Sequence, residues 1–264
     1  MKADFHVHTS FSYDSDAPME SMVVGAINKG IEKICFTEHL DLDFVEPVTV
    51  EFEKYFTELK RLQEKYRGRI EILSGVEFGL QSHLGNACEC LTKKYPFDFV
   101  IGSIHMVDGY DPYYPEYFRQ VKDEEGYRRA FELTLEGIRA TKEIDVLGHL
   151  DYIVRYGNQR ERTYSYIQFS DIIDEILRCL IEKGKGLEVN TAGWKHRLGF
   201  AHPHQDVLKR YKELGGEIIT VGSDAHQSEQ IAYEFDRVKA YLEACGFKYY
   251  TEFRQRKPYF CAIY

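Results

Sequence analysis

The chain has 264 residues, of which 44% are hydrophobic and 29% are charged, and this composition is typical of a globular protein with ample material for a core. Its formal net charge is −9 and its isoelectric point is about 5.6. Such an acidic surface repels nucleic acid and anionic membranes, so we expect neither as a partner. We find no apolar run long enough for a signal peptide or a membrane span, and we therefore predict a cytoplasmic protein whose oligomeric state the sequence does not reveal.

Short apolar, β-branched runs alternate with amphipathic stretches along the chain. The predicted strands are residues 3–9, 32–39, 70–79, 98–105, 144–151, 186–191 and 217–226, with 247–253 as a weaker eighth run. The predicted helices are residues 18–30, 51–68, 126–143, 169–184, 205–216 and 228–246. This alternation indicates parallel strands joined by helical crossovers, and seven or eight such units favour a closed α/β barrel. Because no linker divides the chain, we expect a single domain over residues 1–264.

Two other features are less informative. The six cysteines are scattered and demand no oxidising compartment, and the one close pair, Cys88 and Cys90, favours a helix face over a metal or redox site. The stretch 106–120 is rich in tyrosine and carries Asp and Pro, which predicts a loop over one face of the barrel.

Residues of metal-ligand type end most of the predicted strands. They are His6, His8, His39, Glu77, His105, His149, Asp224 and, two residues further on, His226. In a barrel of parallel strands these ends converge on the C-terminal face, where active sites are built. His6 and His8 are two residues apart, so their side chains point to the same side of a strand. A lone histidine at a strand end is more often structural, but six of the ten histidines at such ends indicate a shared metal site.

The donors are imidazoles and carboxylates without thiolates. This mixture suits Zn, Mn or Fe ions in catalysis rather than a closed structural cysteine site. Eight such ligands are too many for one ion, so the pattern implies two or three ions.

The ordered motifs HVH, TEH, GVEFG, GSIH, GHLD and GSDAH resemble the polymerase-and-histidinol-phosphatase (PHP) superfamily over nearly the whole chain. Within that superfamily, ICFTEHLD, FDFVIGSIH, GHLDYIVRYG, LEVNT and LGGEIITVGSDAH are most similar to the histidinol-phosphate phosphatases. The resemblance implies the PHP fold, a distorted TIM-like (β/α)7 barrel, with three divalent metal ions whose identity among Zn, Mn and Fe stays open.

The resemblance also implies how the ligands are shared among the ions. The first ion takes His6, His8, Glu77 and Asp224, the second shares Glu77 and adds His105 and His149, and the third takes His39 and His226. Many members carry a histidine where this chain has Asp14, and we predict that this carboxylate is a ligand of the third ion rather than a plain turn residue. The residues with an expected catalytic role are His6, His8, Glu77, His105, Asp224 and His226.

The implied reaction is the hydrolysis of a small-molecule phosphomonoester, L-histidinol phosphate, to L-histidinol and phosphate in histidine biosynthesis. A hydroxide that bridges two ions would attack phosphorus. The charges of three divalent ions, three ligand carboxylates, one hydroxide and a phosphomonoester dianion balance, which is consistent with such a substrate. The HCx₅R arrangement of thiol phosphatases is missing from the sequence.

Phosphate also needs fixed donors. Arg155 follows the GHLD motif and Arg197 lies after the sixth predicted strand, and both can grip phosphate oxygens in bidentate fashion, although a loop arginine is usually a solvated charge. Ser103, His202 and Tyr117 are further candidates for substrate contact. The tyrosine-rich loop that contains Tyr117 either encloses an imidazole or is a plain packed loop.

Three alternatives stay open. The same site can serve another substrate, namely a nucleoside monophosphate, an oligonucleotide or phosphotyrosine. An amidohydrolase-type deaminase or lactonase would share the barrel and the HxH motif, but that family commonly carries a bridging carboxylated lysine where this chain has His105. A non-enzymatic metal-binding subunit with a decayed site is disfavoured because every ligand position is filled.

Overall fold

Seven parallel strands form a nearly closed barrel, in the computed structural model that describes residues 1–44, 47–159 and 164–263. The strands are β1 (Ala3–Val7), β2 (Lys33–Leu40), β3 (Glu71–Gly79), β4 (Phe99–Ser103), β5 (Val146–Leu147), β6 (Gly186–Asn190) and β7 (Ile219–Gly222). They lie side by side in chain order, and all six neighbouring pairs are parallel. Ala225, just after β7, exchanges backbone hydrogen bonds with His6 and His8 and so joins the two edges of the sheet. The predicted distorted (β/α)7 barrel is confirmed.

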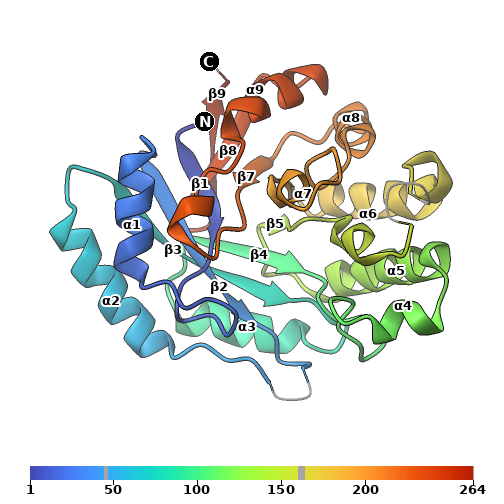
Figure 1. Ribbon diagram of the computed structural model, residues 1–264, viewed down its shortest axis with the longest axis horizontal. Coiled ribbons are helices and arrows are strands. Elements are labelled where there is room, and N and C mark those ends of the chain that lie inside the picture. Colours follow the sequence, from blue (N-terminus) through green and yellow to red (C-terminus); the bar gives the residue numbers. More distant parts are fainter. Residues whose placement is uncertain (45–46, 160–163, 264) are drawn as a thin grey trace.

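Helices surround the strands, with α1 and α2 on one side of the barrel and α5 and α6 on the other (Figure 1). Their bounds are α1 (Met19–Asn28), α2 (Phe52–Lys65), α3 (Gly85–Lys94), α4 (Glu116–Gln120), α5 (Asp123–Ala140), α6 (Ser170–Glu182), α7 (Ala192–Lys195), α8 (Gln205–Glu213) and α9 (Phe235–Ala244). In α2 the apolar residues Tyr55, Leu59 and Leu62 recur every three or four positions and are buried on one face. Gly68 then turns the chain at a φ of 78°, which a residue with a Cβ rarely adopts.

The structure differs from the predicted elements in several places. A helix, α3, fills the segment between β3 and β4, with Cys88 buried and Cys90 exposed. The predicted loop 106–120 ends in the short helix α4. The predicted helix 228–246 is divided into a 3-10 turn at Ser228–Gln230 and the helix α9 from Phe235, because Ala232 and Glu234 adopt left-handed backbone conformations between them.

The eighth predicted run does not join the barrel. It forms β8 (Tyr249–Arg254), which pairs with β9 (Lys257–Ala262) in an antiparallel hairpin. Phe253 of this hairpin packs against Phe99 of β4 with ring centroids 5.1 Å apart, and Arg256 binds the carboxylate of Asp145, which precedes β5. Since these contacts lie at the start of the barrel strands, the hairpin covers the end of the barrel opposite the predicted site.

The C-terminal ends of the strands are packed closely enough to require small residues. Gly222 ends β7, and a Cβ at this position would come within 2.3 Å of the Cβ of His6 and 2.5 Å of a carboxylate oxygen of Glu188. A larger residue would therefore displace the first histidine of the HxH motif. Within the described residues, none of the helices combines the length and the apolar character that a membrane crossing requires.

The hairpin contact gives a stability prediction. Phe253→Ala removes a ring that is 4% exposed, and we expect it to lower the free energy of unfolding by about 3–5 kcal/mol. Phe260→Ala, on the same hairpin but 50% exposed, is the matched control and should change it by no more than about 0.5 kcal/mol. Urea unfolding measures both values, and equal effects of the two variants would contradict the placement of the hairpin.

Candidate metal centre and active site

The barrel brings all of the predicted ligands to one face. His6 lies in β1 and His8 directly after it, His39 lies in β2 and Glu77 in β3. His105, His149, Asp224 and His226 follow β4, β5 and β7. The register of the sheet pairs His39 directly with Glu77, so these two side chains are neighbours because of backbone pairing alone.

Glu77 is the centre of the cluster. Its side chain is fully buried, and five imidazole rings surround it with nitrogen-to-oxygen distances between 2.8 and 3.5 Å. These rings belong to His6, His8, His39, His105 and His149. One carboxylate oxygen, Oε1, faces His105 and His149, whereas Oε2 faces the other three rings. The two oxygens of Glu77 therefore divide the histidines into two groups.

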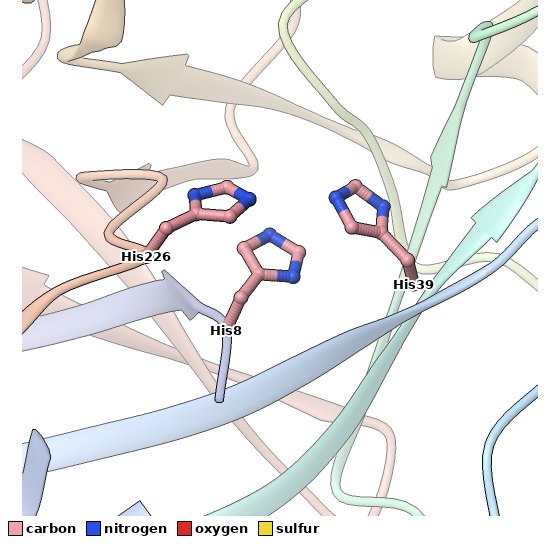
Figure 2. Close-up of side chains that lie close together, drawn as sticks. All are labelled: His8, His39 and His226. Atoms are coloured by element: carbon pink, nitrogen blue, oxygen red, sulfur yellow. The ribbon is translucent and has the colours of Figure 1, made fainter. Parts of the chain in front are cut away.

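Two histidines also lie close to the carboxylate of Asp14. Its Oδ2 lies 3.0 Å from Nε2 of His226 and 3.5 Å from Nε2 of His39. The ring of His8 stacks between these two histidines, with centroids 4.1 Å from His39 and 4.4 Å from His226, and Figure 2 shows the three rings close together. A cavity of about 340 Å³ beside Asp14 and His226 opens this part of the cluster to solvent. Asp14 thus lies next to both histidines that the resemblance assigns to a third ion.

Asp224 lies between the histidines around Glu77 and the histidines around Asp14. Its Oδ1 lies 3.4 Å from Nε2 of His8, 3.9 Å from Nε2 of His6 and 3.7 Å from Nδ1 of His226. The residue has a φ of 54°, in the left-handed region that aspartate tolerates better than most residues. This backbone conformation turns the carboxylate toward the histidines.

The donor atoms fit divalent metal ions. In the described part of the chain, Nε2 of His6, Nε2 of His8, Nδ1 of His39 and Oε2 of Glu77 are buried and have no hydrogen-bond partner. Buried polar atoms of a folded protein normally have such partners, so atoms that instead crowd around one point are suited to coordinate a cation. Three sets of ligand atoms lie close enough to hold an ion: His8, His39 and His226; His6, His8 and Glu77; and His39, Glu77 and His105. Imidazole and carboxylate donors suit zinc, manganese and iron.

The electrostatics of the cluster favour a charged Glu77. Burial opposes ionisation of this carboxyl group, but the neighbouring rings of His6, His105 and His39 hold its pKa well below the usual value. Burial and the repulsion from His39 and His226 lower the pKa of His8 well below its usual value. Glu77 is thus held ionised and His8 neutral, which are the protonation states that metal ligands need. Burial also acts to lower the pKa of His6, but the buried carboxylates Glu188 and Glu77 act in the opposite direction and raise it, so a bound ion would displace a proton from that ring.

Two carboxylates that the sequence did not point to lie next to the ring nitrogens of His6 and His105 that face away from Glu77. Nδ1 of His6 lies 2.6 Å from Glu188 in β6, and Nδ1 of His105 lies 2.8 Å from Asp41, directly after β2. Both carboxylates are buried. Such partners fix the tautomer and the direction of a metal-binding ring. The sequence signal for these two residues is a charged side chain in or next to an apolar run, namely Glu188 in LEVNT and Asp41 in TEHLD.

Ser12 has the same role for His8. Its hydroxyl donates to Glu38 at 2.6 Å, so its oxygen accepts from the backbone N–H of His39 at 3.0 Å and faces Nδ1 of His8 at 3.2 Å. Nδ1 of His8 can donate to this oxygen, which leaves Nε2 directed at the cluster. The buried Glu38 thereby acts on the ring of His8 through a serine.

Arg155 lies beside the cluster, as predicted for a phosphate contact. Its Nη1 is 3.9 Å from Oδ2 of Asp224, and its guanidinium lies over the rings of Tyr152 and Tyr156 at 4.3 and 4.9 Å. The stacking fixes the guanidinium plane. A second cation that the sequence reading missed is Lys195 at the end of α7, whose Nζ donates to the backbone carbonyl of Asp224 at 3.0 Å.

The other predicted substrate contacts have different surroundings. Ser103 and His202 are fully buried, and Nδ1 of His202 lies 2.6 Å from a carboxylate oxygen of Asp151, while Oγ of Ser103 and Nε2 of His202 have no hydrogen-bond partner among the described residues. Arg197 is exposed in the turn after α7, with a φ of 62°. Tyr117 is 5% exposed and its hydroxyl donates to the backbone carbonyl of Gly126, so the structure places it in the packing of α4 against α5 and not in the site, contrary to the prediction.

A different tyrosine of the same loop, Tyr113, is connected to the site through two further rings. Tyr113 contacts Tyr156, which packs on Tyr152, and Tyr152 lies against the ring of His149 with centroids 4.8 Å apart. Asp111, at the start of this turn, accepts the backbone N–H of Tyr113 at 2.8 Å and is half-buried. Burial raises the pKa of Asp111, and the neighbouring His105 acts in the opposite direction. The rim beside His105 and His149 is therefore aromatic with one carboxylate.

Comparison with known proteins agrees with this site. Residues 4–192 match the PHP domain family. The probable histidinol-phosphatase of Clostridium acetobutylicum is 34% identical over 255 residues, which cover 94% of this chain and 95% of the relative. The histidinol-phosphatase of Lactococcus lactis subsp. lactis is 33% identical over 253 residues, or 93% of this chain and 92% of the relative.

A solved structure gives the same result at the level of the fold. The crystal structure of histidinol phosphate phosphatase from Lactococcus lactis, complexed with zinc, L-histidinol and phosphate, matches with a TM-score of 0.91 and 31% identity. The match covers 98% of both chains. The resemblance read from the motifs is confirmed: the chain belongs to the PHP domain family and, within it, to the histidinol-phosphatases.

Proposed function

We propose that the protein is a metal-dependent phosphatase that hydrolyses L-histidinol phosphate to L-histidinol and phosphate with three divalent ions at the C-terminal face of its barrel. The observation that carries the proposal is the cluster of five imidazoles around the buried Glu77. It is supported by a relative of the same fold, covered over 98% of its chain, whose structure contains zinc, L-histidinol and phosphate.

The first two ions would share Glu77. Oε2 of this residue, with Nε2 of His6 and His8 and Oδ1 of Asp224, supplies the donors of the first ion. Oε1, with Nε2 of His105 and His149, supplies those of the second. A carboxylate that faces different histidines with its two oxygens is suited to bridge two cations.

The third ion would lie between Asp14, His39 and His226. Oδ2 of Asp14 is within 3.5 Å of Nε2 of both histidines. His39 is also near the second position, because its Nδ1 lies 3.1 Å from Oε2 of Glu77. The direction of its Nε2 toward Asp14 favours the third ion. Asp14 stands where many family members have a histidine, and its carboxylate is also a donor that Zn, Mn and Fe accept.

Bound ions would supply an activated water and neutralise the oxygens of the phosphoryl group. Side chains of the protein itself would orient the phosphoryl group. Arg155 presents a guanidinium whose plane is fixed by Tyr152 and Tyr156, and such a group binds two oxygens of a phosphate at once. Lys195 is a second positive charge on the same side, held through the carbonyl of Asp224.

The rim suits the organic end of the proposed substrate. The half-buried carboxylate of Asp111 can pair with a cationic amine or imidazolium, and the exposed ring of Tyr113 offers an apolar face beside it. The net charge of −9 also favours a substrate with a cationic organic end. These features favour an amine-bearing phosphomonoester over a nucleotide or an oligonucleotide.

The substrate is tested by phosphate release from protein reconstituted with Mn²⁺ or Zn²⁺. We expect kcat/KM for L-histidinol phosphate to exceed that for p-nitrophenyl phosphate and AMP by roughly several hundredfold, because polar groups of the rim lose their partners with the other two. Removal of the ions by a chelator should abolish the activity, and their return should restore it. Equal, slow turnover of all three esters would keep the metal chemistry but reject the substrate.

Glu77→Gln tests the centre of the site. The variant removes the charge that holds two ions, and we expect it to lose metal and to lower kcat/KM by at least about 100-fold. Glu252→Gln, a buried carboxylate on the hairpin at the other end of the barrel, is the control and should keep its metal. Elemental analysis and phosphate release are measured together, and a Glu77→Gln protein with normal metal content and turnover would contradict the site.

Arg155→Ala tests the phosphate contact. A hydrogen bond to a charged group contributes about 1.5–3 kcal/mol, so kcat/KM should fall by about 10- to 100-fold with unchanged metal content. Arg178→Ala, an exposed arginine of α6, should leave kcat/KM unchanged. If the two variants behave alike, Arg155 does not bind the phosphoryl group, and the same assay on Arg197→Ala decides whether the exposed arginine does.

A further inference from the structure

Asp41 is held rigidly at the edge of the site. It follows β2 directly, its side chain is 2% exposed, and its backbone exchanges two hydrogen bonds with Val48, at 3.1 and 2.9 Å. The carboxylate lies against Gly79, where a Cβ would come within 2.1 Å of Oδ1. The glycine that ends β3 thus makes the space in which this carboxylate reaches the histidines.

Each oxygen of Asp41 faces a different ring. Oδ1 is hydrogen-bonded to Nδ1 of His105 at 2.8 Å, and Oδ2 lies 3.6 Å from Nδ1 of His39. Among the described residues, neither Oδ2 of Asp41 nor Nδ1 of His39 has a hydrogen-bond partner, and both atoms are buried. Nδ1 of His39 also lies 3.1 Å from Oε2 of Glu77, the oxygen assigned to the first ion, so a small rotation of the ring toward Oδ2 of Asp41 would give both buried atoms a partner.

The tautomers of His39 and His105 explain why their contacts with Asp41 matter for metal binding. A neutral imidazole has one N–H group and one lone pair, so a ring that binds an ion through Nε2 carries its proton on Nδ1. Nε2 of His105 is 3.3 Å from Glu77, and Nε2 of His39 is 3.5 Å from Asp14. Both rings would then present an N–H to Asp41.

We infer that Asp41 is a positioning residue that accepts hydrogen bonds from His39 and His105 together, and so orients ligands of two different ions with one carboxylate. This inference rests on the three-ion assignment of the proposed function. Glu188 differs, because it bonds the ring of one predicted ligand, His6, and meets His149 only through the backbone N–H of that residue at 2.9 Å. The second and third metal positions thus depend on one shared group, whereas the first does not.

Asp41→Asn is the test, because it keeps the shape of the side chain but replaces one acceptor by a donor. Zinc binding is measured by competition with a chromophoric chelator, with the bound zinc counted by elemental analysis. We expect two of the three zinc sites to weaken by about 10- to 100-fold and the remaining site to be unchanged. Glu188→Gln, which alters the contact to one ligand ring and keeps an acceptor for the backbone of His149, is the matched control and should weaken mainly one site.

The outcomes separate this inference from the proposed function. If wild-type protein binds fewer than three zinc ions, the three-ion assignment fails. If it binds three and Asp41→Asn weakens one site or none, Asp41 does not serve two ions and the inference is overturned.

A second measurement decides the question if Asp41→Asn does not fold. ¹⁵N NMR of the histidine rings in zinc-loaded wild-type protein reports which nitrogen carries the proton, with assignments from His39→Gln and His105→Gln. We expect a proton on Nδ1 of both rings. A His39 ring with zinc on Nδ1 would overturn the inference, because that nitrogen could not then donate to Asp41.

Discussion

The buried carboxylate of Glu77 is the constraint on which the rest of the site depends. An ionised carboxylate without access to water costs several kcal/mol unless cations or hydrogen-bond donors compensate for the lost hydration. Five imidazole rings converge on it from β1, β2 and the ends of β4 and β5. The rings of His6, His105 and His39 offset this cost by lowering the pKa of Glu77, and divalent ions between the rings and the carboxylate would compensate further. The same cluster therefore explains both how the fold tolerates Glu77 and how it would bind phosphate.

The barrel serves this centre by placing ligands on strand ends and their supports on neighbouring strands. Glu188 in β6 reaches His6 in β1 across the interior, and Asp41 after β2 reaches His105 after β4. Glu38 acts on His8 through Ser12. Because Glu188 and Asp41 come from different strands than the rings of His6 and His105, the orientation of these two rings depends on the assembled barrel. The hairpin β8–β9, at the opposite end, stabilises that barrel without touching the chemistry.

The clustering of the proposed metal ligands could be predicted from the sequence because the reason for their proximity is topological. Parallel strands share one C-terminal face whatever their loops do, so polar residues at the ends of apolar runs must meet there. The supports could not be predicted in this way, since Asp41, Glu188 and Lys195 gain their roles from the direction of single atoms. Tyr117 was misplaced for the same reason: the loop carries several tyrosines, and only the packing of α4 against α5 decides which of them faces the site. Local signals also failed where the pattern was weak, as for α3, whose first residue is Gly85, and β9, whose second residue is Pro258.

The central claim is that Glu77 holds two ions and that a third lies nearby between Asp14, His39 and His226. X-ray diffraction from zinc-loaded crystals, recorded on both sides of the zinc absorption edge, locates the ions directly. The account predicts three anomalous peaks, one at each oxygen of Glu77 and one in contact with Asp14. A single peak at Glu77, or peaks bound to other residues, would contradict it.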